Sequence, residues 1–187
     1  VVVSPILPAN GPILQALLLP PAYAITQASE IGIESALQQI EQALCNGLKL
    51  IQIREKRMAK DLLREFSVQV LALARAHEAN VLINGDVALA REVRADGVHF
   101  TSSQLMALTC RPDVEFGLCA ASCHNAEELW AAEQLGLDFV VLSPVQSTLS
   151  HPGLSPMGWR KFAAMIRDYS LPVYALGGLD FDDLPCA

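Results

Sequence analysis

Apolar and polar residues follow two alternating patterns along this chain from about residue 22 onward. Short apolar runs rich in valine and isoleucine indicate buried strands. They predict strands over residues 22–26, 48–55, 80–84, 96–100, 115–122, 138–143 and 171–177. Between them, apolar residues recur with a helical period. This period predicts helices over residues 34–44, 61–78, 86–93, 125–135 and 159–169.

Several helix ends are marked by residues with strong capping preferences. Asp86 and Asn125 stand just before helical patterns, where their side chains are good N-caps. Gly47 and Gly136 follow two of the helices and are expected to end them.

Alternating strands and helices predict a parallel sheet covered by helices. A doubly wound sheet normally has a G-x-G-x-x-G turn after its first strand, and residues 26–32 read TQASEIG instead. A (β/α)8 barrel fits the regular repeat, although the pattern gives only seven strands. We therefore predict an α/β fold of the TIM-barrel type that lacks, or does not show, its last βα unit.

The first 21 residues differ from the rest of the chain. They contain five prolines, at positions 5, 8, 12, 20 and 21. We interpret residues 1–21 as a Pro-rich interdomain linker or leader, and residues 22–187 as one C-terminally incomplete barrel domain.

Composition narrows the classes of partner. Of the 187 residues 52% are hydrophobic, and the formal net charge is −7, which argues against disorder and against a nucleic-acid or anionic-membrane surface. There is no basic segment of the signal-peptide type, so we expect a cytoplasmic protein. The five cysteines lack a zinc-ligand spacing and are expected to be small buried residues.

The segment Ile51–Lys56, IQIREK, raises a question about one face of a strand. Because side chains alternate along a strand, Gln52, Arg54 and Lys56 share a side. Two interpretations stay open. Either the cations pair with Glu55 or a helix carboxylate in solvent, or they line a pocket for an anion, since Arg and Lys together are typical of phosphate sites.

Polar residues also gather at other predicted strand ends, where the sites of such barrels lie. Gly177 and Gly178 form either a ligand-binding backbone or a plain tight turn. We interpret His99 as a packed core histidine, and His124, before a helix start, as a candidate base. The remaining candidates at strand ends are Thr26, Asn84, Ser122 and Ser143.

Seven motifs occur in an order that resembles the thiamine phosphate synthase/TenI family of (β/α)8 barrels. They are YAIT, IQIREK, VLING, ADGVHF, ASCHNAEELWAAEQLGLDFVVLSPV, GLSPMGW and PVYALGG, and the resemblance covers roughly residues 22–184. The family contains two activities. The synthase joins a pyrimidine diphosphate to a thiazole phosphate with Mg²⁺ and releases pyrophosphate, and the tautomerase moves a proton on a thiazole carboxylate phosphate without metal.

The resemblance implies that Gln52, Arg54 and Lys56 match the diphosphate-binding strand of the synthase. The family's metal carboxylates, however, correspond to Gly85 and Gln104 here, so no Mg²⁺ and no other cofactor is expected. The synthase's Thr-x-Thr-Lys loop is reduced to Thr148 and Ser150, which we keep as phosphate-binding candidates.

Asn84-Gly85 and Ser122-Cys123-His124 resemble the tautomerase branch. The resemblance therefore implies a metal-independent thiazole tautomerase, an isomerase, with His124 as the acid/base. The substrate would be a small phosphorylated thiazole, held by the Gly177-Gly178 amides. Synthase activity is the alternative.

A further resemblance, to the TenI-like part of bacterial MutT-type fusions, implies a covalently linked N-terminal Nudix domain outside this chain. On that interpretation the domain could instead be a non-catalytic module that senses a phosphorylated ligand. Association into a homo-oligomer is a further partner that we consider for this chain.

Overall fold

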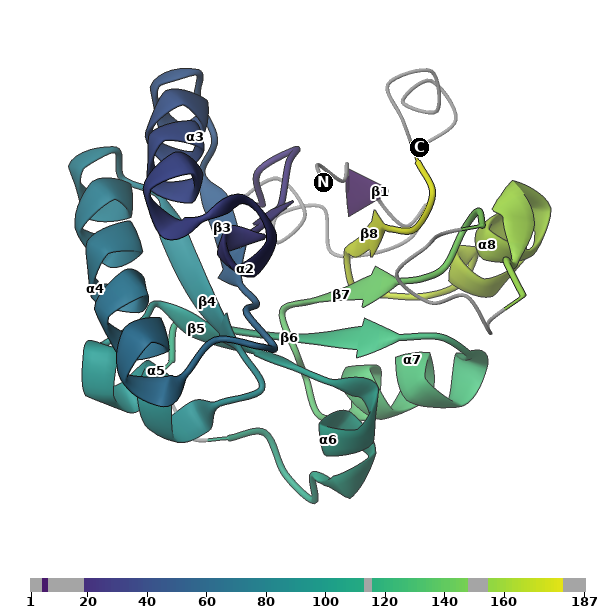
Figure 1. Cartoon of the computed structure of the whole chain (residues 1–187). Coiled ribbons are helices and arrows are strands. Elements are labelled where there is room, and N and C mark those ends of the chain that lie inside the picture. Colours follow the sequence, from purple (N-terminus) through teal and green to yellow (C-terminus); the bar gives the residue numbers. More distant parts are fainter. Residues whose placement is uncertain (1–4, 7–18, 113–115, 148–154, 180–187) are drawn as a thin grey trace. The chain divides into compact units, whose positions relative to one another are not determined.

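A computed structural model describes residues 5–6, 19–112, 116–147 and 155–179 (Figure 1). The chain divides into two compact units, which we describe separately. The first unit is built on residues 22–99 with 116–118. The second is built on residues 100–112, 119–147 and 155–179, together with residues 5–6 and 19–21.

The first unit is a parallel sheet in which each strand is followed by a helix. Its strands pair in the order β5-β4-β3-β2, with Ile51 beside Val81 and Ile83 beside Val98. The strands are β2 (Ala24–Ile25), β3 (Leu50–Ile53), β4 (Asn80–Asn84) and β5 (Gly97–Phe100). The helices are α2 (Ala28–Ile31), α3 (Ile33–Cys45), α4 (Lys60–Ala76) and α5 (Val87–Val93).

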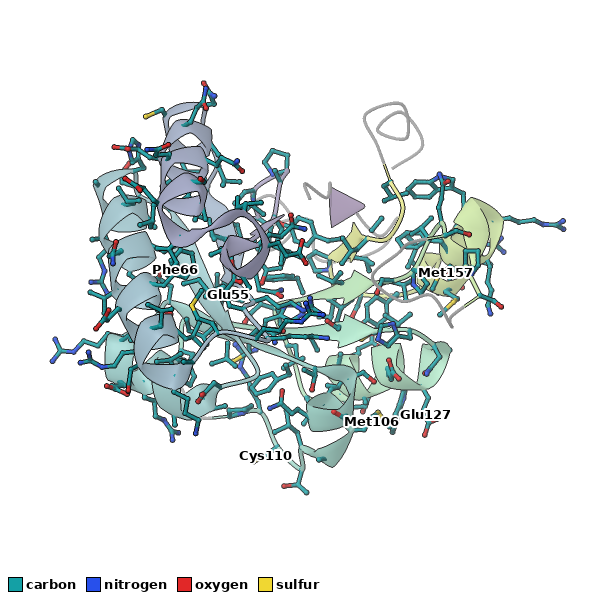
Figure 2. All side chains as sticks on the ribbon, in the orientation of Figure 1. Glu55, Phe66, Met106, Cys110, Glu127 and Met157 are labelled. Atoms are coloured by element: carbon teal, nitrogen blue, oxygen red, sulfur yellow. The ribbon has the colours of Figure 1, made fainter. Side chains whose placement is uncertain are left out.

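The apolar stripe of the long helix α4 packs into the core of the first unit. Phe66, labelled in Figure 2, and Val70 are fully buried on this stripe. The central strand β4 is buried from Val81 to Ile83, as expected for a parallel strand covered on both faces.

The second unit continues the same alternation. Strands β6, β7 and β8 are parallel, and the two-residue strand β1 pairs antiparallel with β8. The strands are β1 (Pro5–Ile6), β6 (Leu118–Cys123), β7 (Phe139–Leu142) and β8 (Val173–Ala175). The helices are α6 (Ser102–Ala107), α7 (Ala126–Gln134) and α8 (Gly158–Ile166).

Part of the Pro-rich leader packs against this second unit. Pro5 lies opposite Tyr174 in the antiparallel pair, and the Tyr174 hydroxyl donates a hydrogen bond of 2.6 Å to the carbonyl of Pro20. These residues are therefore in contact with the sheet that they precede, and the boundary at residue 21 stays a prediction.

Four helices end in the same way, which explains the regular spacing of the repeat. A residue one or two positions after each helix end has a positive φ. These residues are Gly47, Glu78, Arg94 and Gly136. The next residue then donates its backbone N–H five residues back into the helix, as Leu48 does to Ala43 at 3.0 Å and Leu137 to Ala132 at 3.1 Å. This is the Schellman arrangement, and it turns the chain directly into the next strand.

An aspartate at a strand start fixes the neighbouring strand in each unit. Asp96, before β5, accepts a hydrogen bond of 2.8 Å from the backbone N–H of Val81. Asp138, before β7, accepts one of 2.7 Å from Cys119. Both carboxylates therefore satisfy a backbone donor at the beginning of the preceding strand.

Each predicted helix is found within a few residues of its expected bounds. Strand β4 has the predicted bounds, and the other strands are shorter than expected. Helices α2 and α6 were not predicted, because four and six residues are too few to establish a helical period. The predicted N-caps are confirmed, since the side chain of Asp86 accepts from Leu89 and that of Asn125 from Glu128.

The expectation that the cysteines are buried is correct for two of the four that the structure describes, and Cys186 lies outside the described residues. Cys119 and Cys123 are buried, but Cys45 and Cys110 are exposed because they lie at a helix end and in a loop rather than in a strand. Within the described ranges, no helix is both long enough and apolar enough to cross a membrane.

Candidate functional site

The end of strand β3 carries the amide and the two cations that the sequence singled out. Gln52 is buried within the strand, Arg54 is half-buried just after it, and Lys56 is exposed. The backbone N–H of Arg54 donates to the side-chain oxygen of Thr26 at 3.1 Å, which holds this segment beside the end of β2. The exposure of these three side chains therefore increases along the segment, from the buried Gln52 to the exposed Lys56.

A chain of buried hydrogen bonds fixes the amide of Gln52. Its Nε2 donates to the hydroxyl of Tyr23 at 3.0 Å, and this hydroxyl lies 3.2 Å from Nδ1 of His99. The tautomer of His99 decides which atom of this second contact donates, because the Tyr23 hydroxyl can both donate and accept. All three side chains are buried, which confirms the interpretation of His99 as a packed core histidine.

His99 is held neutral by its surroundings. Burial is the main cause that lowers the pKa of His99 to about 3, and the positive charge of Arg54 contributes to the same shift. Arg54 therefore lies close enough to act on this interior chain.

The two cations of this segment repel each other. Burial lowers the pKa of Arg54, and the charge of Glu55 partly offsets that effect. The charge of Arg54 is the main cause that lowers the pKa of Lys56, with burial second. In the part of the chain that the structure describes, neither cation forms an ion pair with a carboxylate.

Glu55 was one of the carboxylates considered as an ion-pair partner for Arg54 and Lys56, but its side chain caps helix α2. Its carboxylate accepts from the backbone N–H groups of Ala28 at 2.7 Å and Ser29 at 2.8 Å, at the start of α2 (Figure 2). Burial raises the pKa of Glu55, but the hydrogen bonds it accepts, including those from Thr26 and Ser29, outweigh burial and lower it. The solvent-exposed ion pair considered from the sequence is therefore not formed with Glu55.

The residues at the end of strand β4 are Asn84, Gly85 and Asp86, and of these three only Asp86 has a carboxylate. Asn84 is half-buried at the last position of the strand, and Gly85 follows with a φ of +72° and donates its N–H to the carbonyl of His99 at 2.9 Å. Asp86 comes next, and its carboxylate accepts from Leu89 at 2.9 Å as the cap of α5.

In the second unit, His124 is oriented by the strand beside it. Its Nδ1 lies 2.8 Å from the carbonyl oxygen of Ser143 and 3.4 Å from that residue's hydroxyl. The carbonyl can only accept, so Nδ1 carries the proton. Glu128 accepts the backbone N–H of His124 at 2.7 Å, and Ser122 is half-buried two positions before it on β6.

Gly177 and Gly178 are required by close backbone packing. A Cβ on Gly177 would lie 2.8 Å from Cα of Pro144, and one on Gly178 would lie 2.3 Å from the carbonyl oxygen of Ser147. Gln146 also donates to the carbonyl of Gly177 at 2.8 Å. The tight-turn interpretation thus has a sufficient structural reason. Thr148 and Ser150 lie outside the described residues.

Sequence reasoning missed Tyr23 and Glu55 as organising residues. Tyr23 was only part of an apolar strand, although a buried tyrosine usually needs a partner for its hydroxyl. Glu55 lies between the two cations in the sequence, and its use as a helix cap depends on contacts 26 and 27 residues away.

Parallel strands with polar residues at their carboxyl ends place this chain among α/β proteins of the barrel type. More specifically, the chain belongs to the thiamine monophosphate synthase family (TMP-TENI), whose model matches residues 22–186. The family predicted from the motifs is thereby confirmed.

Relatives and a solved structure agree with this placement. The chain is 34% identical over 167 residues, 89% of each protein, to "Putative thiamine-phosphate synthase 2" of Aquifex aeolicus. It is 33% identical to "Putative thiamine-phosphate synthase" of Geobacter sulfurreducens, over 87% of this chain and 78% of that protein. The fold is also similar to the solved structure of a thiamine phosphate pyrophosphorylase from Pyrococcus furiosus, with a TM-score of 0.73 at 22% identity. The match covers 92% of this chain and 81% of that protein. This likeness confirms the fold class.

These relatives correct the functional prediction. They are named as synthases, which makes the prediction of a thiazole tautomerase wrong and favours the alternative of the synthase. The Asn84-Gly85 and Ser122-Cys123-His124 motifs misled because short motifs at strand ends also have local structural roles. The names give no support to a Nudix fusion.

The residues present do not fit the Mg²⁺ that the family resemblance implies. Gly85 has no side chain, and Gln104 is engaged in a capping box, where its Oε1 accepts the backbone N–H of Thr101 at 3.0 Å. Asp86 is committed to capping α5. Across the described ranges, no three His, Cys, Asp or Glu residues are grouped as a metal site would require.

Proposed function

We propose that this chain is a thiamine-phosphate synthase, which joins a pyrimidine diphosphate to a thiazole phosphate and releases pyrophosphate. The observation that carries the proposal is the 34% identity to a putative thiamine-phosphate synthase over 89% of both chains. The strand-end segment of Gln52, Arg54 and Lys56 supports it, because these residues match the diphosphate-binding strand of that enzyme.

On this proposal, Arg54 and Lys56 bind the diphosphate. The bond between the pyrimidine and the diphosphate breaks, its electron pair stays on the departing pyrophosphate, and the thiazole forms the new bond. Negative charge therefore grows on the leaving group beside two cations, which stabilise it more in the transition state than in the bound substrate. No step is assigned to a metal ion.

Gln52 has an orienting role in this proposal. Its amide is held by Tyr23, and Tyr23 is held by His99, so the second N–H and the carbonyl of Gln52 keep a fixed direction. A fixed, buried amide recognises a heterocycle at little entropic cost.

A second candidate function is binding of the same phosphorylated ligands without turnover. The observation that favours it is the donor set at the family's metal positions, a glycine and a capping glutamine. A diphosphate can be bound by cations, whereas catalysis in the family is associated with Mg²⁺.

The proposed function is tested by mixing the full chain with the pyrimidine diphosphate and the thiazole phosphate and measuring thiamine phosphate and pyrophosphate. We expect equal amounts of both products, reduced about a hundredfold or more in Arg54→Ala, since a charged contact to the leaving group contributes roughly 2–3 kcal/mol. Absence of product in Mg²⁺, in Mn²⁺ and in EDTA would support binding alone.

A further inference from the structure

The end of β3 places two positive charges, those of Arg54 and Lys56, on one short segment. Arg54 is half-buried, and its charge acts on both Lys56 and His99. Within the described residues, neither Arg54 nor Lys56 has an ion pair. Keeping a partly buried guanidinium next to an ammonium costs free energy unless an anion is bound there.

The carboxylate that is nearest in the sequence, that of Glu55, forms no ion pair with Arg54 or Lys56. Glu55 lies between Arg54 and Lys56 in the sequence, but its two oxygens accept the N–H groups that open α2. Its position is thus set by the helix start, and Glu55 does not form a bidentate pair with the guanidinium of Arg54.

The positions that carry metal carboxylates in the family have other roles here. Gly85 has a backbone conformation of positive φ that favours glycine, and its N–H bonds to His99. Gln104 and Thr101 satisfy each other's backbone donors in a complete capping box. Asp86 caps α5, where its Oδ1 accepts from the backbone N–H of Leu89 at 2.9 Å.

We propose that this segment binds a diphosphate group directly through Arg54 and Lys56, without a divalent cation. The choice of a diphosphate as the ligand rests on the proposed function. The absence of metal dependence rests instead on the donor set just described.

Direct binding follows from the charges available. A diphosphate offers acceptor oxygens on two phosphorus atoms, so a guanidinium fork and an ammonium can each bond to it. The half-buried position of Arg54 limits screening by salt, whereas the exposed Lys56 contributes less and in a salt-dependent way. Arg54 should therefore contribute more to affinity than Lys56.

The test is calorimetric titration of the full chain with inorganic pyrophosphate, in EDTA and in excess Mg²⁺. We expect binding in EDTA to be at least as tight as in Mg²⁺. Arg54→Gln should weaken it about tenfold or more, as the loss of a charge-assisted contact does. Lys60→Gln, which removes an exposed cation from the first turn of α4, is the matched control and should change Kd less than twofold.

Two results would overturn the inference. One is binding that appears only with Mg²⁺, and the other is binding in EDTA that neither Arg54→Gln nor Lys56→Gln weakens. Lys56 is exposed, so its variant provides the test if Arg54→Gln does not fold. Turnover measured on the same preparations separates the two proposals, because metal-free binding without product supports the inference and contradicts the proposed function.

Discussion

The two units each place a histidine at a strand end and surround it differently. His99, in the first unit, is fully buried, bonded to Tyr23 and next to the charge of Arg54. His124, in the second unit, is half-buried and bonded to the backbone carbonyl of Ser143. The first environment combines cations with a neutral interior. The second combines neutral hydrogen-bonding groups with the carboxylate of Glu128, which accepts the backbone N–H of His124.

This difference teaches that the position at a strand end does not determine a residue's chemistry. In the first unit, Arg54 and Lys56 form no ion pair with any carboxylate that the structure describes, which points to an anionic ligand. In the second unit, Gly177 and Gly178 are explained by the approach of Pro144 and Ser147, and need no ligand to account for them. Function is therefore expected to respond to changes in the first unit, and stability to changes at the glycines of the second.

The largest effect on stability is expected for Gly178→Ala. Gly178 and Gly136 have nearly equal φ values of +67° and +65°, but only at Gly178 would a Cβ meet backbone atoms. We expect Gly178→Ala to lower the free energy of unfolding by about 2–4 kcal/mol, and Gly136→Ala by about 1 kcal/mol. Urea denaturation measures both, and equal losses would contradict the role of close packing.

Asp96 and Asp138 make the same interaction in different units, since each carboxylate accepts a backbone N–H of the neighbouring strand. Asp138→Ala removes the acceptor of Cys119 and the ion pair with Arg111, whose Nη2 lies 2.7 Å from Asp138, whereas Asp96→Ala removes only the acceptor of Val81. We expect losses of about 2–3 and about 1–2 kcal/mol. A larger loss for Asp96→Ala in thermal or urea unfolding would show that the ion pair contributes nothing.

His99 should make stability depend on pH in the first unit. Its pKa is about 3 in the folded chain and 6.5 without the fold, so the unfolded chain alone takes up a proton between these values. Stability from His99 is therefore complete above pH 6.5 and falls by a few kcal/mol as the pH drops toward 3.

The control for this effect is His99→Gln, which cannot titrate. Its free energy of unfolding should fall less steeply between pH 6.5 and pH 4 than that of the unchanged chain, because the other titrating groups are common to both. Parallel curves in urea unfolding would mean that His99 is not held neutral by burial.

The smallest effect is expected at the helix end of Arg94. This residue has a φ of +56°, which costs a side-chain-bearing residue more than glycine, and its carbonyl bond to Arg75 would be kept. Arg94→Gly should raise stability by about 0.5–1 kcal/mol, after allowing for the greater freedom of glycine when unfolded. A clear loss of stability would contradict the strain at this position.

Local patterns predicted much of the fold and part of the site. The strand period placed Gln52, Arg54 and Lys56 together, and capping preferences identified Asp86 and Asn125 correctly. The chain of Gln52, Tyr23 and His99 could not be predicted, because Tyr23 and His99 are 76 residues apart and only the sheet brings them together. For the same reason the sequence could not show that Glu55 caps α2 instead of pairing with its neighbours.

The function was mispredicted for a related reason. Asn84-Gly85 and the segment from Ser122 to His124 are short motifs, and their likeness to the tautomerase branch outweighed the cationic strand in the sequence interpretation. Similarity over most of the chain to synthases is broader evidence.

The most direct test of the anion site is a crystal structure of the chain grown with inorganic pyrophosphate in EDTA. The account predicts pyrophosphate with its oxygens on the guanidinium of Arg54 and the ammonium of Lys56. Pyrophosphate bound only at Gly177 and Gly178, with nothing at Arg54, would contradict it.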